Sequence, residues 1–251
     1  MSELRSFFRR WLLAFLLPRP LIGIFYIPRY MKSWRNYSSV EESMPVRLRD
    51  SHPCLTDWVS ETPFDAHYFY QGAWLGREVA NVKPSLHIDI GSSVMSIAVL
   101  SGFVETVFVD YRPLKANING LSSVASDILH LPFKVASIRS LSCLHVIEHI
   151  GLGRYGDPVD PEGSRKAASE LKSLLSPGGK LYISLPVGKA KVCFNAHRVH
   201  SPEQVMNMFS GLKLISFCCV DDYGNFVADA PTSIAENFDY GCGMFVFQKL
   251  E

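Results

Sequence analysis

The 251-residue sequence has no CxxC pair, no internal repeat, no low-complexity tract and no unbroken apolar run of membrane-spanning length near its start. A spanning helix needs about 20 apolar residues, and here Pro18, Arg19 and Pro20 interrupt the apolar stretch. No small-x-small cleavage site follows it, which argues against a cleaved signal peptide. The hydrophobic content of 47% is typical of a globular protein with a full core.

The six cysteines give no sign of a disulfide framework or a paired-cysteine metal site. Cys218 and Cys219 are adjacent and cannot easily serve one metal or one disulfide. We therefore expect free thiols in a reducing cytoplasm.

Net charge is also small, at +1, but it is unevenly distributed. Residues 1–35 hold seven basic residues and one acid, so their net charge is +6, and the remainder is at −5. An acidic body without a Pro-Pro-Tyr motif argues against a nucleic-acid partner.

Residues 1–35 form a basic and apolar head. Trp, Phe and Leu could enter the acyl boundary while Arg and Lys meet anionic head groups, so we expect peripheral attachment to the cytoplasmic face of a membrane. A helix packed on the rest of the protein or on a second subunit is the main alternative, and it leaves an oligomer open. True insertion or a cleaved signal is the least favoured interpretation.

The remaining chain divides into a polar, aromatic-bearing cap at residues 36–84 and a domain at residues 85–251. In the domain, strand-like and helix-like patterns alternate. This alternation predicts an α/β, Rossmann-like fold with a mostly parallel, seven-stranded sheet and helices on both faces.

Acidic residues stand at the ends of the first three predicted strands. Asp89 ends the first, Asp110 the second and Asp127 the third, and Gly91 forms a turn after the first. Ligands of open α/β sheets bind at these carboxyl ends, where an acid after the second strand can accept both ribose hydroxyls.

Five segments carry a resemblance to a known family. They are HIDIGSS, VFVDYRP, SDILHLPF, SLSCLHVIEH and LSPGGKLYISLPVG. In order and spacing, residues 85–187 resemble class I S-adenosylmethionine-dependent methyltransferases, which implies S-adenosyl-L-methionine as cofactor. By that resemblance the cofactor-binding residues are Asp89, Gly91, Ser92 and Ser93 for the methionine part, Asp110 and Tyr111 for the ribose, and Asp127 and Ile128 for the adenine.

The first loop departs from the family pattern. Two further glycines are usual there, and this sequence has Ser93 and Met95. Serine can donate a hydrogen bond to the cofactor carboxylate, whereas methionine would crowd the cofactor unless the helix begins differently.

A second, narrower resemblance lies in residues 148–163, EHIGLGRYGDPVDPEG. This segment resembles the signature of an uncharacterised bacterial family of unknown function, DUF268, whose members accompany surface-polysaccharide genes. The resemblance implies a glycan setting.

Histidines after the fourth predicted strand are the candidate bases, because neutral imidazole can take a hydroxyl proton near pH 7. His149 is the first choice, with His145 and Glu148 beside it as further catalytic candidates. For His145, the alternative is a buried strand-end histidine satisfied by backbone. His145 and His149 could also bind a metal with Asp157 or Asp160, but two histidines without a fixed third ligand are weak evidence, and no metal is predicted.

Two polar segments offer candidate substrate-binding side chains: Arg154, Tyr155 and Asp157 in GLGRYGDP, and His197, Arg198 and His200 in NAHRVH. These groups could grip a sugar or a phosphate. A turn held by its own salt bridge is the alternative for the first segment, and surface charge is the alternative for Arg198.

The sequence thus favours an O-methyltransferase acting on a sugar or lipid-linked glycan in polysaccharide biosynthesis. A non-catalytic, methyltransferase-like scaffold of a polysaccharide assembly complex is the second hypothesis, favoured by Ser93 and Met95. A nicotinamide-dependent reductase is disfavoured, because the dinucleotide glycine spacing and a Tyr-x-x-x-Lys pair are missing.

Overall fold

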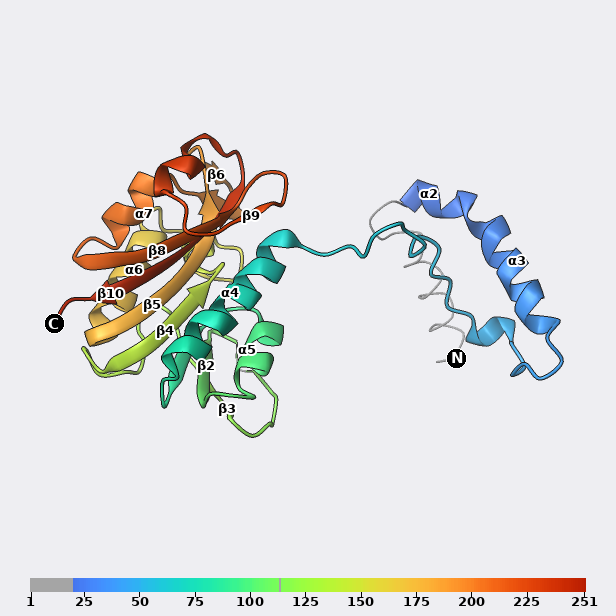
Figure 1. The fold of residues 1–251 in the computed structure, drawn as a ribbon, viewed down its shortest axis with the longest axis horizontal. Helices are drawn as coiled ribbons and strands as arrows, with labels where there is room; N and C mark the ends of the chain where they lie inside the picture. Colours follow the sequence, from blue (N-terminus) through green and yellow to red (C-terminus); the bar gives the residue numbers. More distant parts are fainter. Residues whose placement is uncertain (1–19, 113) are drawn as a thin grey trace. The chain divides into compact units, whose positions relative to one another are not determined.

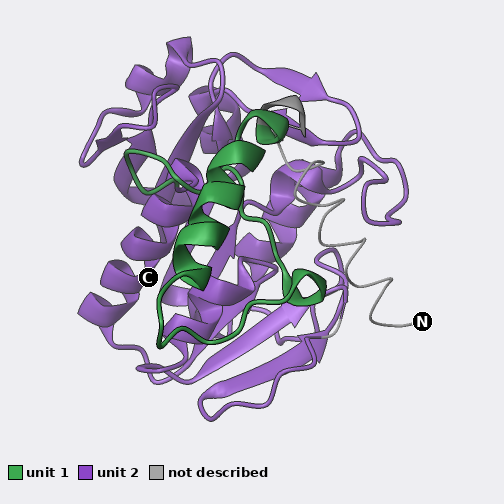
Figure 2. Cartoon of the chain, turned by 90° about the vertical axis from the view of Figure 1, so that its right-hand side faces the viewer, with its two compact units in different colours: residues 1–63 green, residues 64–251 purple. Residues whose placement is uncertain are grey.

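The computed structural model describes residues 20–112 and 114–251, and the chain divides into two compact units, residues 1–63 and 64–251 (Figures 1 and 2). The expectations that concern residues 1–19, including most of the proposed membrane-binding head, lie outside the described residues. In the described ranges, no helix has both the length and the apolar character needed to cross a membrane.

Unit 1 contains helices α2 (Pro20–Phe25) and α3 (Ile27–Ser38) and a short 3₁₀ helix, η1 (Leu48–Asp50). Arg29 of α3 donates a hydrogen bond to the Leu55 carbonyl at 2.9 Å. The same guanidinium lies 4.6 Å from the Trp58 ring centroid, at cation–π distance. The Trp58 ring therefore packs against Arg29 within unit 1.

Unit 2 is built on an eight-stranded sheet with the order β3-β2-β1-β4-β5-β10-β8-β9. The strands from β3 to β5 are parallel, and β10, β8 and β9 are antiparallel to their neighbours. The order reverses between β1 and β4, which is the switch point where open sheets bind ligands. The strands are β1 His87–Ile90, β2 Thr106–Asp110, β3 Leu121–Ala125, β4 Ile138–Leu144, β5 Leu175–Val187, β8 Leu212–Val220, β9 Phe226–Val227 and β10 Gly241–Lys249.

Helices cover both faces of this sheet (Figure 1). Helices α4 (Ala66–Val82) and α5 (Val94–Leu100) pack on one face. Helices α6 (Gly163–Leu174) and α7 (Pro202–Met208) pack on the other. Alternate side chains of a strand point to opposite faces of the sheet. In β5, Leu181 and Ile183 pack with residues of α6, whereas Tyr182 packs with residues of α4.

Local signals explain where two of these helices begin. Asp65 caps α4, accepting a hydrogen bond from the Tyr68 amide at 3.1 Å. Ser201 and Gln204 form a reciprocal capping box at the start of α7.

The predicted Rossmann-like architecture is confirmed, with three differences in detail. The sheet has eight strands where seven were expected, because the two-residue β9 adds an edge beside β8. A separate hairpin, β6 (Lys191–Cys193) with β7 (His197–Val199), occupies a segment for which no strand was predicted. Helix α4, assigned from sequence to the cap region, is part of unit 2.

Candidate functional site

A first cavity of about 380 Å³ lies at the carboxyl ends of β1, β2 and β4, beside the switch point. Its volume is in the range of small-molecule sites. Its wall includes seven of the residues that sequence reasoning assigned to cofactor binding or to catalysis: Gly91, Asp110, Tyr111, Asp127, Ile128, His145 and His149.

Gly91 shapes the turn at the floor of this cavity. Its backbone is left-handed, with φ of +67°, a conformation that glycine adopts without strain. A β-carbon here would lie 3.2 Å from the Val146 side chain and 3.8 Å from Oδ2 of Asp110. The absence of a side chain therefore keeps the space beside the Asp110 carboxylate open.

Asp110 presents one carboxylate oxygen to the first cavity. Its Oδ1 accepts hydrogen bonds from the Arg112 amide at 2.7 Å and from Arg112 Nε at 3.3 Å. Its Oδ2 has no hydrogen-bond partner among the described residues. Asp127 is held similarly, because its Oδ1 accepts from the Leu129 amide at 2.9 Å. Both carboxylates are therefore oriented by their own loops.

Asp89 and Ser92 lie beneath the turn and outside the lining of the first cavity. The Asp89 carboxylate is fully buried and accepts hydrogen bonds from the Ser92 amide at 3.0 Å, the Ser92 hydroxyl at 2.6 Å and the Ser142 hydroxyl. Burial raises the pKa of Asp89 to about 6, despite these hydrogen bonds. Their position ties β1 to β4 and supports the turn, and direct contact with a cofactor stays a prediction.

The serine and methionine that replace family glycines do not block the first cavity. Ser93 is the N-cap residue of α5, and neither it nor Met95 belongs to the cavity lining. The Met95 side chain points to solvent, with 75% of the residue exposed. The crowding expected from Met95 is therefore absent.

A second cavity, of about 540 Å³, adjoins the first. Its walls come from the start of α4, the loop after β4, the β6–β7 hairpin and the segment before β10. Three residues, His145, His149 and Tyr155, line both cavities. Two ligands, one in each cavity, would thus face each other across these side chains.

Glu148 is a buried carboxylate shared by two histidines. Its Oε1 lies 2.8 Å from Nδ1 of His145 and 3.8 Å from Nε2 of His149. Burial opposes a charge on His145, but Cys242 and Glu148 outweigh it and raise the pKa of His145 well above its ordinary value. Burial likewise opposes ionisation of Glu148, yet His145 and His149 leave its pKa lowered. The pair is therefore an imidazolium and a carboxylate.

His149 has a defined tautomer. Its Nδ1 lies 2.5 Å from the Ala196 carbonyl oxygen, which can only accept, so Nδ1 carries a proton. In the neutral ring, Nε2 is then the basic nitrogen. The side chain keeps 13% of its surface accessible, whereas that of His145 keeps 5%. Among the two histidines, His149 is the better placed to receive a proton.

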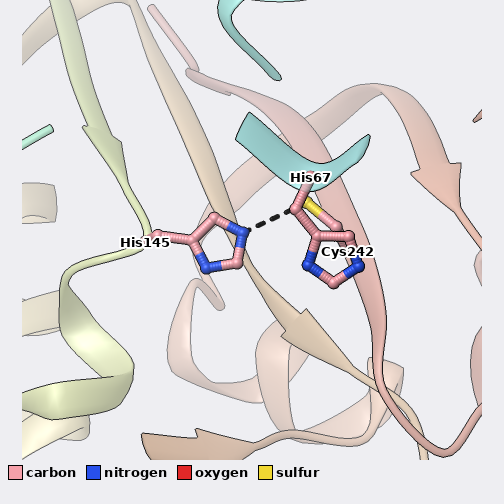
Figure 3. Close-up of side chains that lie close together, drawn as sticks. All are labelled: His67, His145 and Cys242. Carbon is pink, nitrogen blue, oxygen red and sulfur yellow. Dashed lines mark hydrogen bonds between the residues drawn. The ribbon is translucent and has the colours of Figure 1, made fainter. Parts of the chain in front are cut away.

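The structure adds two residues that sequence reasoning missed, His67 on α4 and Cys242 on β10 (Figure 3). Cys242 Sγ lies 3.4 Å from His145 Nε2, and the His67 ring stacks on that of His145 with centroids 5.6 Å apart. Burial and the neighbouring His145 lower the pKa of His67 to about 4, so its ring is neutral at pH 7. Small residues flanking Cys242, in YGCGMF, were the one available hint of close packing there.

Arg154, Tyr155 and His197 line the second cavity, as a substrate-binding role requires. Asp157 instead holds the loop, accepting hydrogen bonds from the amides of Gly151 at 2.6 Å and Tyr155 at 3.2 Å.

Arg198 and His200 lie elsewhere, on a third cavity of about 560 Å³ beside α6 and α7. Arg198 is buried and donates to the carbonyls of Ile150 at 2.6 Å and Asp160 at 3.1 Å. Its hydrogen bonds fasten the loop after β4, and a role in binding the acceptor stays a prediction.

The metal-ligand set considered from sequence is not assembled. The Asp157 carboxylate binds backbone amides, and Asp160 pairs with Lys166 at 2.6 Å. Within the described ranges, the cluster with metal-ligand spacing is His67, His145 and Cys242.

The strand order, the switch-point cavity and the acids at the strand ends define a class I methyltransferase fold, and solved structures agree. NodS, an N-methyltransferase from Bradyrhizobium japonicum solved with S-adenosylhomocysteine, matches with a TM-score of 0.53 at 15% identity, covering 88% of this chain and 98% of that chain. A Burkholderia thailandensis 1,6-didemethyltoxoflavin-N1-methyltransferase with bound S-adenosylhomocysteine matches at 0.52 and 14%, covering 74% and 79%. A cyclase, SpnF, matches at 0.50 and 11%, covering 70% and 81%. Similarity at this level shows the fold alone.

The family model that matches residues 121–237 is described as Caenorhabditis protein of unknown function, DUF268. The resemblance of residues 148–163 to this family is thereby confirmed, but its description as bacterial is wrong, and the expected link to surface polysaccharides has no support. No curated protein sequence matches the chain.

Proposed function

We propose that the protein is an S-adenosylmethionine-dependent methyltransferase that methylates a hydroxyl group. The observation that carries this proposal is the meeting of two cavities at His145, His149 and Tyr155. One cavity has the acids suited to a nucleoside, and the other has a polar wall with a histidine base. Such an arrangement brings an acceptor and a methyl donor together from opposite sides.

The residues of the first cavity fit the cofactor. Asp110 Oδ2 is free to accept hydrogen bonds from ribose hydroxyls. Ile128 and Leu129 offer an apolar surface for an adenine ring, and Asp127 can accept its amino group. When bound, the cofactor supplies a methyl group on a positively charged sulfur.

His149 is the proposed base. Its Nδ1 proton is committed to the Ala196 carbonyl, so Nε2 can accept the proton that a hydroxyl loses. Glu148, 3.8 Å from Nε2, would stabilise the imidazolium that results. His145 does not suit this task, because it already carries a proton that Glu148 and Cys242 hold in place.

The second cavity suits a polar acceptor with several hydroxyls, such as a sugar, free or lipid-linked. Arg154, His197, Tyr240 and Asp65 offer donors and acceptors around it. Tyr155 and Tyr68 offer ring faces on which a sugar could pack. The basic head of residues 1–35 would hold the protein at an anionic membrane surface, where a lipid-linked acceptor would be found.

Calorimetric titration with S-adenosylhomocysteine tests the proposal. Saturable 1:1 binding that Asp110→Ala weakens is the expected result. Failure of the folded protein to bind would favour the alternative of a non-catalytic scaffold. Binding without transfer to any hydroxyl acceptor in a radiolabelled-methyl screen would leave a cofactor-binding protein and overturn the reaction.

A further inference from the structure

The second cavity contains a cluster of metal-ligating side chains drawn from three separate elements. His67 comes from the first turn of α4, His145 follows β4, and Cys242 begins β10 (Figure 3). One ligand atom of each lies within 4.8 Å of the others. Two imidazole nitrogens and a sulfur are the donor set that zinc prefers in proteins.

The spacing of the ligand atoms agrees with coordination of one ion. Bonds of about 2.0–2.1 Å to nitrogen and 2.3 Å to sulfur place tetrahedral ligand atoms about 3.5 Å apart. His145 Nε2 and Cys242 Sγ are separated by 3.4 Å. The ligand nitrogen of His67 lies within 4.8 Å of both atoms, so coordination would require this partly exposed side chain to move closer to them.

Glu148 supplies the outer support that metal-binding histidines have. It accepts the Nδ1 hydrogen of His145 at 2.8 Å, which directs Nε2 toward Cys242. Its second oxygen, Oε2, is fully buried and has no hydrogen-bond partner among the described residues. A carboxylate placed here, together with a thiolate ligand, would balance the charge of a divalent cation.

We propose that His67, His145 and Cys242 bind a zinc ion whose fourth coordination position opens into the second cavity. Both histidines line that cavity, while Cys242 is fully buried behind them. Three protein ligands and one open position are the arrangement of catalytic zinc sites. In a role that rests on the proposed function, the open position would bind the acceptor hydroxyl and lower its pKa before His149 takes the proton.

The test uses full-length protein, freed of metal with a chelator and titrated with cobalt(II) and then with zinc chloride. One cobalt ion per chain should bind, with the thiolate-to-metal charge-transfer band of a Co–S bond and the strong visible bands of tetrahedral cobalt. Zinc should displace it and abolish both signals. The absence of 1:1 binding would overturn the proposal and leave a hydrogen-bonded Cys242–His145 pair.

Variants separate coordination from folding. Cys242→Ser should remove the charge-transfer band, whereas Cys219→Ala, at an equally buried cysteine on β8, should keep it. His67→Ala is a second test in case the buried Cys242→Ser variant misfolds, because a helix such as α4 tolerates alanine. This variant should weaken zinc binding at least tenfold. Glu148→Gln should weaken it about 10- to 100-fold, as loss of an outer-shell partner does. A band that survives Cys242→Ser would contradict the assignment.

S-adenosylhomocysteine binding, measured on the same samples, keeps the two proposals apart. Zinc binding without cofactor binding would leave the metal site standing and remove methyl transfer. Cofactor binding without zinc binding would overturn the metal site and leave the proposed methyl transfer standing.

Discussion

The first and second cavities differ in how far apart in the sequence their lining residues lie. The first draws its acids and turns from consecutive strand ends, β1 to β4, each followed at once by its loop. The second combines His67 of α4, the loop after β4, the β6–β7 hairpin and Tyr240. Parallel strands all place their carboxyl ends, and the residues that follow, at the same edge of the sheet. The second cavity instead depends on how segments distant in the sequence pack together. The sequence therefore allows more of the first cavity to be predicted than of the second.

The largest effect is expected at the boundary between the two cavities. His149→Ala should reduce turnover by about 10²–10⁴-fold, the usual contribution of a positioned base. Cofactor affinity should stay within twofold, because His149 acts on the acceptor. Steady-state rates with an identified acceptor and calorimetry with S-adenosylhomocysteine measure the two quantities.

His200→Ala is the matched control, because His200 lines the third cavity. Its turnover should equal that of the wild type. If His200→Ala abolishes turnover while His149→Ala retains it, the base has been assigned to the wrong histidine.

Within the first cavity, Asp110→Ala should weaken S-adenosylhomocysteine binding by about 1.5–3 kcal/mol, the contribution of hydrogen bonds to a charged group. Glu236→Ala, an exposed acid on the 3₁₀ helix η3 (Thr232–Asn237), controls for the change in net charge. Equal affinities for the two folded variants would remove Asp110 from the ribose role.

Arg198 offers a test of the structural role that its hydrogen bonds indicate. Arg198→Ala leaves the Ile150 carbonyl without its donor and leaves the Asp160 carbonyl with the Gly163 amide alone, so the free energy of unfolding should fall by about 1–3 kcal/mol. Urea denaturation measures it, with the exposed Arg165→Ala as control. A stability loss no greater than that of Arg165→Ala would return Arg198 to the candidates for ligand binding.

The smallest effect on either cavity should come from removing residues 1–35. The shortened protein should keep its affinity for S-adenosylhomocysteine and lose co-sedimentation with anionic vesicles, because the +6 charge and the apolar runs are gone. Neutral vesicles are the control. Full-length protein that stays in the supernatant with anionic vesicles at low salt would exclude the membrane role.

The contrast between the cavities also explains what sequence could predict. Asp110 and Asp127 were correctly expected at the edge of the sheet that carries the first cavity, because the position of an acid at a strand end is known once the strands are known. Cys242 was interpreted as a free thiol, since its distance from His145 depends on β10 pairing antiparallel between β5 and β8. The backbone contacts of Arg198 were missed for a related reason, because the carbonyls that receive its hydrogen bonds lie on a loop far earlier in the chain. Long-range pairings of this kind leave no periodic signal.

The attachment of the loop after β4 has a consequence for its motion. Arg198 binds this loop through backbone carbonyls, and Asp157 binds it through backbone amides, so both contacts hold the chain itself and not only its side chains. A segment anchored in this way opens only when the surrounding packing opens. These contacts hold the backbone that carries His149. The hydrogen-bonded amides of Gly151 and Leu152 should exchange more slowly than the amides of the exposed Arg154 and Gly156, which have no hydrogen-bond partner among the described residues. Entry to the second cavity must then depend on the segments facing that loop, the start of α4 and Tyr240.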